Sequence, residues 1–326
     1  MLHTDPFAVR ELLGPDAAPG RRAITNEHGI VLPAFTDHHV HLHLIEEQDL
    51  APHGVAAAVD LGGDPVALAR RPRGGFPRIS YAGAFLTAKG GYPVGRPWAP
   101  EAVWREVADA SPHPGVPGGA ATAVDEQAAC GASVIKVALN SAAGPVFDAE
   151  TLAVVVACAR ERGLPVVAHV EGEGMTRLAL DAGVDALAHT PFSERLGIRV
   201  TSRAAATQVW VSTLDIHGDD PDAAENAALN LAAFREAGGR VVYGTDLGNG
   251  DRTAGIQSGE LAALDRAGVR GPALIAALAD PWPGTATTHA VATFVPGEPP
   301  ETLDEIPGWL GAATVVPEEE IVRDEH

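Results

Sequence analysis

Two histidines lie two positions apart in the segment of residues 33–41, which reads PAFTDHHVH. In a β-strand, alternate side chains point to the same face, so the rings of His39 and His41 are expected to point the same way. Two imidazoles that converge at a strand end are a common arrangement for binding a divalent cation. Histidines also fill cores and cap strands, so this pair alone leaves both interpretations open.

Lys136 lies in the middle of the apolar segment 132–139, which is predicted to be a strand buried on both faces. A buried ammonium group is costly unless it is paired or loses its charge. Lys89 and Lys136 are the only lysines in the chain, in which arginine supplies nearly every other cation. An uncharged amine can add carbon dioxide to form a carbamate that bridges two metal ions, whereas a guanidinium group cannot. The alternative is a lysine that extends to water at the mouth of the fold.

Three further polar residues, His169, His189 and Asp246, each close a short apolar run. Each has an ordinary alternative role, as a hydrogen-bonded buried histidine or as an aspartate that caps the next helix. In a barrel of parallel strands, however, the carboxyl ends of the strands meet on the face where barrel enzymes have their active sites. The shared position of these residues, more than any one of them, predicts a functional site.

The elements that must position these residues alternate between short apolar runs and longer helix-like segments, which is typical of a parallel sheet with crossover helices. Eight such units over about 250 residues predict an α/β fold of the (β/α)8 TIM-barrel type. A doubly wound open sheet is disfavoured because no phosphate-binding glycine loop follows the first strand. Strands are predicted at 33–41, 54–61, 78–85, 132–139, 164–170, 184–189, 208–214 and 240–246, and helices at 99–110, 122–130, 148–162, 172–182, 222–237, 257–267 and 271–279.

The barrel is assigned to residues 33–294, and the two flanks, 1–32 and 295–326, to a reduced β-flap. The flanks are short and contain few strand candidates, which are 22–25, 29–32 and 312–316. These segments are expected to pair with one another beside the barrel.

The composition of the chain excludes several classes of function. The chain has 326 residues, of which 46% are apolar and 20% charged, which suits a folded globular protein with a full core. Two cysteines cannot build a disulfide scaffold, and a net charge of −20 argues against nucleic-acid partners. The chain has no apolar run of the roughly 18 residues that a membrane span needs, and no targeting pattern. A soluble cytoplasmic protein with a small-molecule substrate and no membrane partner is expected, and whether it forms a homo-oligomer is left open.

These residues resemble the metal-binding set of the amidohydrolase superfamily, namely Asp37-x-His39-x-His41, Lys136, His169, His189 and Gly244-Thr-Asp246. The likeness covers roughly residues 30–290 and is closest to the imidazolonepropionase-like and prolidase-like branch, from the segments 131–136, 166–169 and 182–189. The resemblance implies that His39, His41 and Asp246 bind one divalent ion and that His169 and His189 bind the other. Carboxylated Lys136 and a hydroxide would bridge the two ions. Zinc is the expected metal and manganese the alternative.

Two departures from the family pattern qualify the resemblance. The flanks are shorter than the β-sandwich that the family usually builds from both termini. Gly172 stands where family deaminases have a glutamate three residues after the histidine of the fifth strand. Together with Lys136, this glycine argues against a mononuclear deaminase.

The function implied is that of a binuclear metal-dependent hydrolase that cleaves an amide-type C–N bond with a metal-bridging hydroxide. Two cations lower the pKa of a shared water, and Asp246 can move its proton to the leaving group. The substrate would be a peptide, a cyclic amide or an N-acyl small molecule. The alternatives are a lactonase, esterase or phosphoesterase on the same site, or a non-catalytic scaffold relative, which would be expected to have lost ligands.

Two loops are expected to contact the substrate. The long loop of residues 87–98, after the third strand, is rich in glycine and contains Lys89, Tyr92 and Arg96, which could meet an anionic or aromatic substrate. His217 follows the seventh strand and could donate a hydrogen bond. A solvated surface loop is the alternative for residues 87–98.

Overall fold

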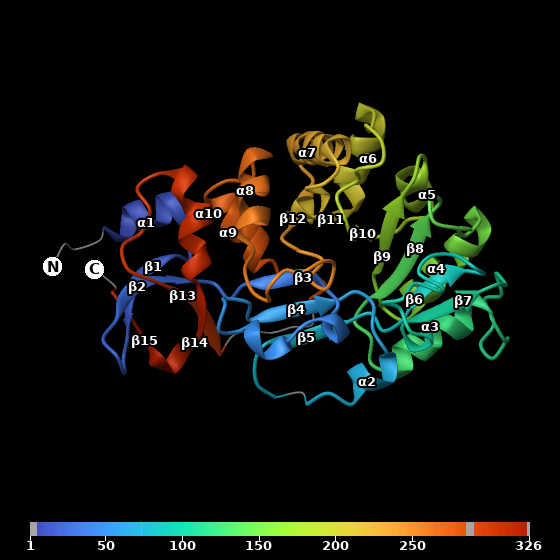
Figure 1. Cartoon of the computed structure of the whole chain (residues 1–326), viewed down its shortest axis with the longest axis horizontal. Coiled ribbons are helices and arrows are strands. Elements are labelled where there is room, and N and C mark those ends of the chain that lie inside the picture. Colours follow the sequence, from blue (N-terminus) through green and yellow to red (C-terminus); the bar gives the residue numbers. More distant parts are fainter. Residues whose placement is uncertain (1–4, 73, 285–289, 325–326) are drawn as a thin grey trace.

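Two sheets of parallel strands form the centre of the molecule in the computed structural model, which describes residues 5–72, 74–284 and 290–324 (Figure 1). The larger sheet has seven strands in the order β12-β11-β10-β9-β8-β6-β7, and the smaller has three in the order β3-β4-β5. The strands are β3 (Thr36–Val40), β4 (Ala57–Asp60), β5 (Arg78–Tyr81), β6 (Phe85–Ala88), β7 (Trp104–Val107), β8 (Ile135–Asn140), β9 (Val166–Glu171), β10 (Ala186–Leu187), β11 (Val209–Val211) and β12 (Arg240–Val242).

Backbone hydrogen bonds join the two sheets at two places. The amide of His38 in β3 donates to the carbonyl of Tyr243 at 3.0 Å, just after β12, and Val40 pairs with Leu247 in a parallel bridge. At the other place the amide of Ser133, just before β8, donates to the carbonyl of Tyr81 at 2.8 Å. The first predicted strand therefore lies beside the segment predicted as the eighth strand. The third predicted strand lies beside the segment predicted as the fourth.

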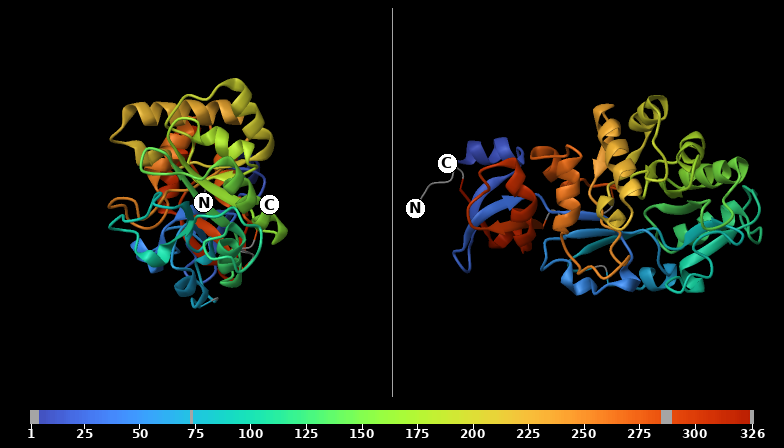
Figure 2. Two further views of the ribbon diagram at one scale, coloured as in Figure 1. Left: turned by 90° about the vertical axis from the view of Figure 1, so that its right-hand side faces the viewer. Right: turned by 45° about the horizontal axis from the view of Figure 1, so that its top comes forward.

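Helices pack on the outer faces of the strands, and each predicted helix except the first is confirmed to within a few residues (Figure 2). In α4, Leu152, Val155 and Val156 face the core at helical spacing, and the Asp148 carboxylate caps the first turn by accepting from the amide of Thr151 at 2.7 Å. The helices beside the strands are α2 (Pro65–Ala69), α3 (Ala120–Ala129), α4 (Ala149–Glu161), α5 (Met175–Asp181), α6 (Ile198–Thr207), α7 (Pro221–Glu236), α8 (Ser258–Arg266) and α9 (Pro272–Ala279).

The predicted helix at 99–110 is wrong. Residues Glu101–Val103 form a single 3₁₀ turn after Pro100, and β7 follows at once and pairs with β6. Proline disfavours a helical conformation at the residue before it, and the aromatic and branched side chains of β7 favour a strand. The predicted strand 78–85 is also divided, because Gly83 takes a φ of 76° that separates β5 from β6.

The flanking segments form the expected β-flap, an antiparallel sheet in the order β14-β13-β2-β1-β15. Both termini lie at this end of the elongated molecule (Figures 1 and 2). Three details differ from the prediction. The strand predicted at 22–25 lies at residues 18–22, and two strands were not predicted, one that begins at Val291, before the boundary drawn at 295, and one that begins at Ile321. The strands are β1 (Ala18–Arg22), β2 (His28–Leu32), β13 (Val291–Pro296), β14 (Thr314–Pro317) and β15 (Ile321–Arg323).

The flap packs on the rest of the molecule through two helices. Helix α1 (Pro6–Leu13) contacts α9, and the short α10 (Ile306–Trp309) contacts α8. Leu13 and Ile306 are fully buried in the main hydrophobic core, which also contains residues from the helices and strands of the centre. The flap and the sheets therefore share one core. Within the described residues, the helices are all too short or too polar to cross a bilayer.

Candidate metal centre

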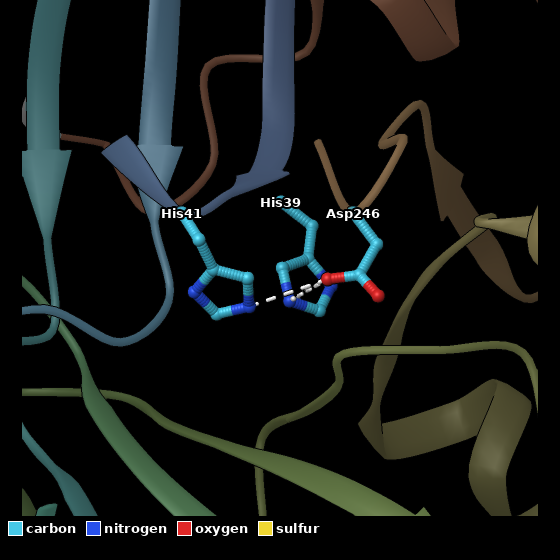
Figure 3. Close-up of side chains that lie close together, drawn as sticks. All are labelled: His39, His41 and Asp246. Atoms are coloured by element: carbon cyan, nitrogen blue, oxygen red, sulfur yellow. Dashed lines mark ion pairs between the residues drawn. The ribbon is translucent and has the colours of Figure 1, made fainter. Parts of the chain in front are cut away.

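The side chains of His39, His41 and Asp246 converge, although the two histidines and the aspartate are far apart in the sequence (Figure 3). The Oδ1 atom of Asp246 lies 3.1 Å from Nε2 of His39 and 3.3 Å from Nε2 of His41. All three side chains are buried, and one ligand atom from each lies within 4.8 Å of the others. This geometry is suited to one divalent cation held by two imidazoles and a carboxylate.

The hydrogen bonds of the two rings determine which nitrogen faces Asp246. Nδ1 of His39 lies 2.8 Å from the carbonyl of Ala188, and Nδ1 of His41 lies 3.1 Å from the carbonyl of Gly62. A carbonyl only accepts, so each Nδ1 carries the proton and each Nε2 presents a lone pair. Lone pairs that face a carboxylate oxygen repel it unless a cation or a proton lies between them.

Asp37 fixes the relative position of the strand and the loop that supply these ligands. Its carboxylate accepts from the amides of His39 at 3.0 Å and Thr245 at 3.1 Å, and from the hydroxyl of Thr245 at 2.5 Å. Burial raises the pKa of Asp37 to about 7, and these hydrogen bonds oppose that rise. Asp246 itself adopts a left-handed φ of 55°, which aspartate tolerates better than most residues.

Lys136 belongs to the same cavity. Its side chain is 1% exposed, and its Nζ atom has no hydrogen-bond partner among the described residues. The centroid of the Phe85 ring lies 5.4 Å from this atom. Burial lowers the pKa of Lys136 to about 7, against the opposing effect of Asp246 and Asp60. An unpaired amine of this kind is a suitable site for carbamate formation and fits a ligand set for cations.

His189 and His169 extend the cluster beyond the first three ligands. The ring of His189 lies 4.8 Å from that of His39 and 5.0 Å from that of His169, centroid to centroid. The hydroxyl of Thr213 lies 2.9 Å from Nδ1 of His189 and orients the ring. Thr213 is held at a φ of 43°, a costly conformation for a β-branched residue and a feature typical of functional sites.

The side chains of Glu171 and Asn140 lie beside the Nε2 atom of His169. Nε2 of His169 lies 3.3 Å from the Glu171 carboxylate, which also accepts from the Asn140 amide at 2.6 Å. The hydrogen bond with His169 lowers the pKa of Glu171, against the opposing effect of burial. The Asn140 amide nitrogen also lies 3.3 Å from Nε2. Since Nε2 is occupied by these two hydrogen-bonding groups, Nδ1 of His169 is left as the nitrogen able to bind a metal.

One cavity of about 410 Å³ contains all six predicted ligands. Tyr92 and His217 also line it, whereas Lys89 and Arg96 are exposed and do not. Other lining residues were not predicted. The aromatic and aliphatic ones carry no signal of their own, because such residues are common in every core, and the remaining ones are polar or glycine residues of loops and strand ends, which are equally common elsewhere. They are Leu44, Phe85, Trp98, Glu171, Phe192, Ile216, Gly248, Asn249 and Gly250.

The two predicted substrate residues that do line the cavity take different positions. The ring of Tyr92 stacks on that of His169, with centroids 5.0 Å apart and an angle of 23° between the planes. His217 is buried against Phe192, with ring centroids 4.3 Å apart, and its Nε2 atom has no hydrogen-bond partner among the described residues. Burial lowers the pKa of His217 to about 4, so this ring is neutral near pH 7.

Comparisons with known proteins place the fold. No family model matches the sequence, and no curated protein matches it. A solved Xaa-Pro dipeptidase with bound methionine is 18% identical, with a TM-score of 0.67 over 90% of this chain and 87% of that one. An amidohydrolase of 20% identity has the same TM-score and coverage, and the A. niger ochratoxinase, also 20% identical, has a TM-score of 0.66 over 88% of this chain and 82% of its own. The predicted likeness to amidohydrolases is confirmed for the fold.

Proposed function

We propose that this protein is a binuclear metal-dependent hydrolase of the prolidase-like amidohydrolases and that it cleaves an amide-type C–N bond. The observation that carries the proposal is the cavity in which four histidines, Asp246 and an unpaired buried lysine amine meet. The names of the similar structures, a dipeptidase and an amidohydrolase among them, favour the same class of reaction. An unpaired buried amine lowers the stability of the folded protein, and a non-catalytic scaffold gains no function from it.

The proposed ligand sets follow the geometry. His39, His41 and Asp246 would hold one ion, and Nδ1 of His169 together with His189 would hold the other, with a carbamate on Lys136 shared between them. Divalent ions there, zinc or manganese, would lower the pKa of a bound water and polarise the substrate carbonyl.

The protein's own groups would move the proton. The Asp246 carboxylate takes a proton from the attacking water and returns it to the leaving nitrogen, so that no proton has to cross the apolar cavity. The amide of Asn249 donates to Oδ2 of Asp246 at 3.0 Å and orients the carboxylate for both transfers. Burial raises the pKa of Asp246, but His39 and His41 outweigh that effect and lower it well below its usual range. This carboxylate is therefore ionised near pH 7.

The same proposal includes a closed (β/α)8 barrel built from β3, β4, β5, β8, β9, β10, β11 and β12. Two sets of hydrogen bonds support it. The first joins β3, an edge of the smaller sheet, to the segment after β12, an edge of the larger one, and the second joins Tyr81 of β5, the other edge of the smaller sheet, to Ser133 just before β8. Closure would also explain why the polar residues at the strand ends converge on one cavity.

Metal content and hydrolysis test the proposal directly. Protein stripped with a chelator and reloaded with zinc or manganese is expected to bind two ions per chain and to hydrolyse members of a panel of dipeptides, cyclic amides and N-acyl amines. Elemental analysis and product detection would measure both. If lactones or phosphoesters were hydrolysed faster than every amide, the protein would be a lactonase or a phosphoesterase instead of an amidase. Failure to bind stoichiometric metal would favour the scaffold.

Replacing Thr213 by valine tests the orientation of His189. Valine keeps the branched shape and the backbone strain but removes the hydroxyl that lies 2.9 Å from Nδ1 of His189. The affinity for the second ion is expected to fall roughly 10- to 100-fold, as is typical when the partner of a metal-binding histidine is lost. Competition with a chromogenic chelator would measure the affinity. Thr213→Ser, which keeps the hydroxyl, is the matched control, and equal losses in both variants would contradict the proposed orientation.

A further inference from the structure

The part of the cavity beyond the proposed metal ligands is mainly aromatic and aliphatic. Phe85, Tyr92 and Trp98 form one group, which we call the aromatic group, with ring centroids 5.9 Å apart for Tyr92 and Trp98 and 6.1 Å for Phe85 and Trp98. Phe192 and Ile216 line the same cavity beside His217. A volume of about 410 Å³ lies within the roughly 300–1,000 Å³ of small-molecule sites. Such a lining favours a compact substrate with apolar substituents.

His217 supplies a hydrogen-bonding group within this apolar lining. Its side chain is 7% exposed, and its Nε2 atom has no hydrogen-bond partner among the described residues. Because a buried polar atom without a partner is costly, an incoming group that bonds to it would gain that energy. A neutral ring nitrogen can bond to an uncharged amide group in either tautomer, because an amide both donates and accepts, and it supplies no positive charge to balance a carboxylate.

The charges around the cavity oppose a substrate with a free carboxylate. Among the described residues, its lining contains no arginine, and its one lysine, Lys136, lies among the proposed metal ligands. Glu171 lines the cavity as a partly buried carboxylate. Arg96 is exposed, and its guanidinium lies 5.8 Å from the Tyr92 ring centroid rather than in the lining. Apart from the metal ions, which are proposed to act on the amide carbonyl and the water, a substrate carboxylate would therefore lose water and meet Glu171 without a matching cation.

We infer that the substrate of this site is a neutral amide with an aromatic substituent and no free carboxylate, held between the aromatic group and the Nε2 atom of His217. This inference rests on the proposed function and narrows it. In the reaction, the amide C–N bond breaks and a C–O bond forms with the oxygen of water. One proton of water goes to the leaving nitrogen, so the products are a carboxylic acid and an amine, one of which carries the aromatic substituent.

Three benzoyl anilides that differ only at the para position of the aniline ring test the inference. They carry hydrogen, a neutral carboxamide or a carboxylate, and the last two are nearly the same size. With metal-loaded protein, kcat/KM for the carboxamide is expected to exceed that for the carboxylate roughly 100-fold, since an uncompensated charge must be desolvated. Equal rates, or a preference for the carboxylate, would overturn the inference.

Two substitutions locate the source of this preference. Ile216→Arg places a cation in the lining and should narrow the 100-fold difference to roughly tenfold or less, whereas Ile216→Gln, of similar length but neutral, should preserve it. Arg96→Gln should leave the ratio between the two substrates unchanged. A selective loss of the carboxylate substrate in that variant would identify Arg96 as a carboxylate-binding residue and would also overturn the inference.

Binding separates this inference from the proposed reaction. Calorimetric titration of the anilides into metal-loaded Asp246→Asn protein reports their affinity without turnover. If the carboxamide binds more tightly than the carboxylate but the unsubstituted protein hydrolyses no anilide, the substrate preference of the site stands and the proposed hydrolase activity is wrong. If the anilides are hydrolysed but the carboxamide and the carboxylate do not differ in affinity or rate, the hydrolase activity stands and the substrate preference is wrong.

Discussion

Asp246→Asn is expected to reduce kcat by roughly 10³- to 10⁴-fold, because an amide cannot accept the proton that the carboxylate carries from water to the leaving nitrogen. Asparagine has nearly the same shape and keeps one oxygen that can face His39 and His41, so metal content should stay near two ions per chain. Steady-state kinetics and elemental analysis on the same preparation would measure both quantities.

The control for this prediction is Asp219→Asn, which changes an exposed carboxylate outside the cavity and should leave kcat within about twofold. Survival of activity in Asp246→Asn with two ions bound would show that another group moves the proton. Loss of metal in that variant would instead show that the carboxylate serves mainly to hold the first ion.

Lys136→Met is expected to abolish hydrolysis and, at the same time, to stabilise the metal-free protein. Methionine fills a similar volume without an amine, so the carbamate cannot form and the second ion is lost. The metal-free chain no longer has to bury an unpaired amine, which should increase its free energy of unfolding by about 1–3 kcal/mol. Urea unfolding of both proteins in the presence of a chelator would measure this difference.

The pH dependence of that difference follows from the pKa of Lys136, which falls from 10.5 to about 7 on folding. Between these values the unfolded chain binds more protons than the folded one, so the stability of the unsubstituted protein rises with pH. The advantage of Lys136→Met should therefore be greatest below pH 7 and shrink as the pH approaches 10.5. A variant that is less stable than the unsubstituted protein at pH 6 would show that Lys136 has a partner in solution.

The sequence predicted that six polar residues would lie together, whereas their roles as metal ligands stay predictions. A lysine within an apolar strand and histidines at strand ends are conspicuous in a sequence, because burial of polar residues is costly. His39, His41, Lys136, His169, His189 and Asp246 do line one cavity. Six of the seven predicted helices are confirmed, because residues such as Leu152 and Val155 repeat at helical spacing and Asp148 caps their first turn, whereas α1, α2, α6 and α10 were not predicted.

What sequence could not predict depends on distant contacts. The strand β7 pairs with β6, and four residues are too few to show an alternating pattern that would have marked them as an edge strand. Phe85 and Phe192 line the cavity while other phenylalanines, such as Phe234, fill the core, and nothing in their local sequence separates the two uses. Lys89 and Arg96 share a loop with Tyr92, but only the tyrosine turns inward.

The hydrogen bonds between Asp37 and Thr245 join residues that are 208 positions apart. A contact of such long range has a high entropic cost, since the ends of a large loop must be brought together. Ion capture by His39, His41 and Asp246 would thus report that this junction has formed. A partially folded state without the junction would remain metal-free and distinguishable from the mature protein by this property alone.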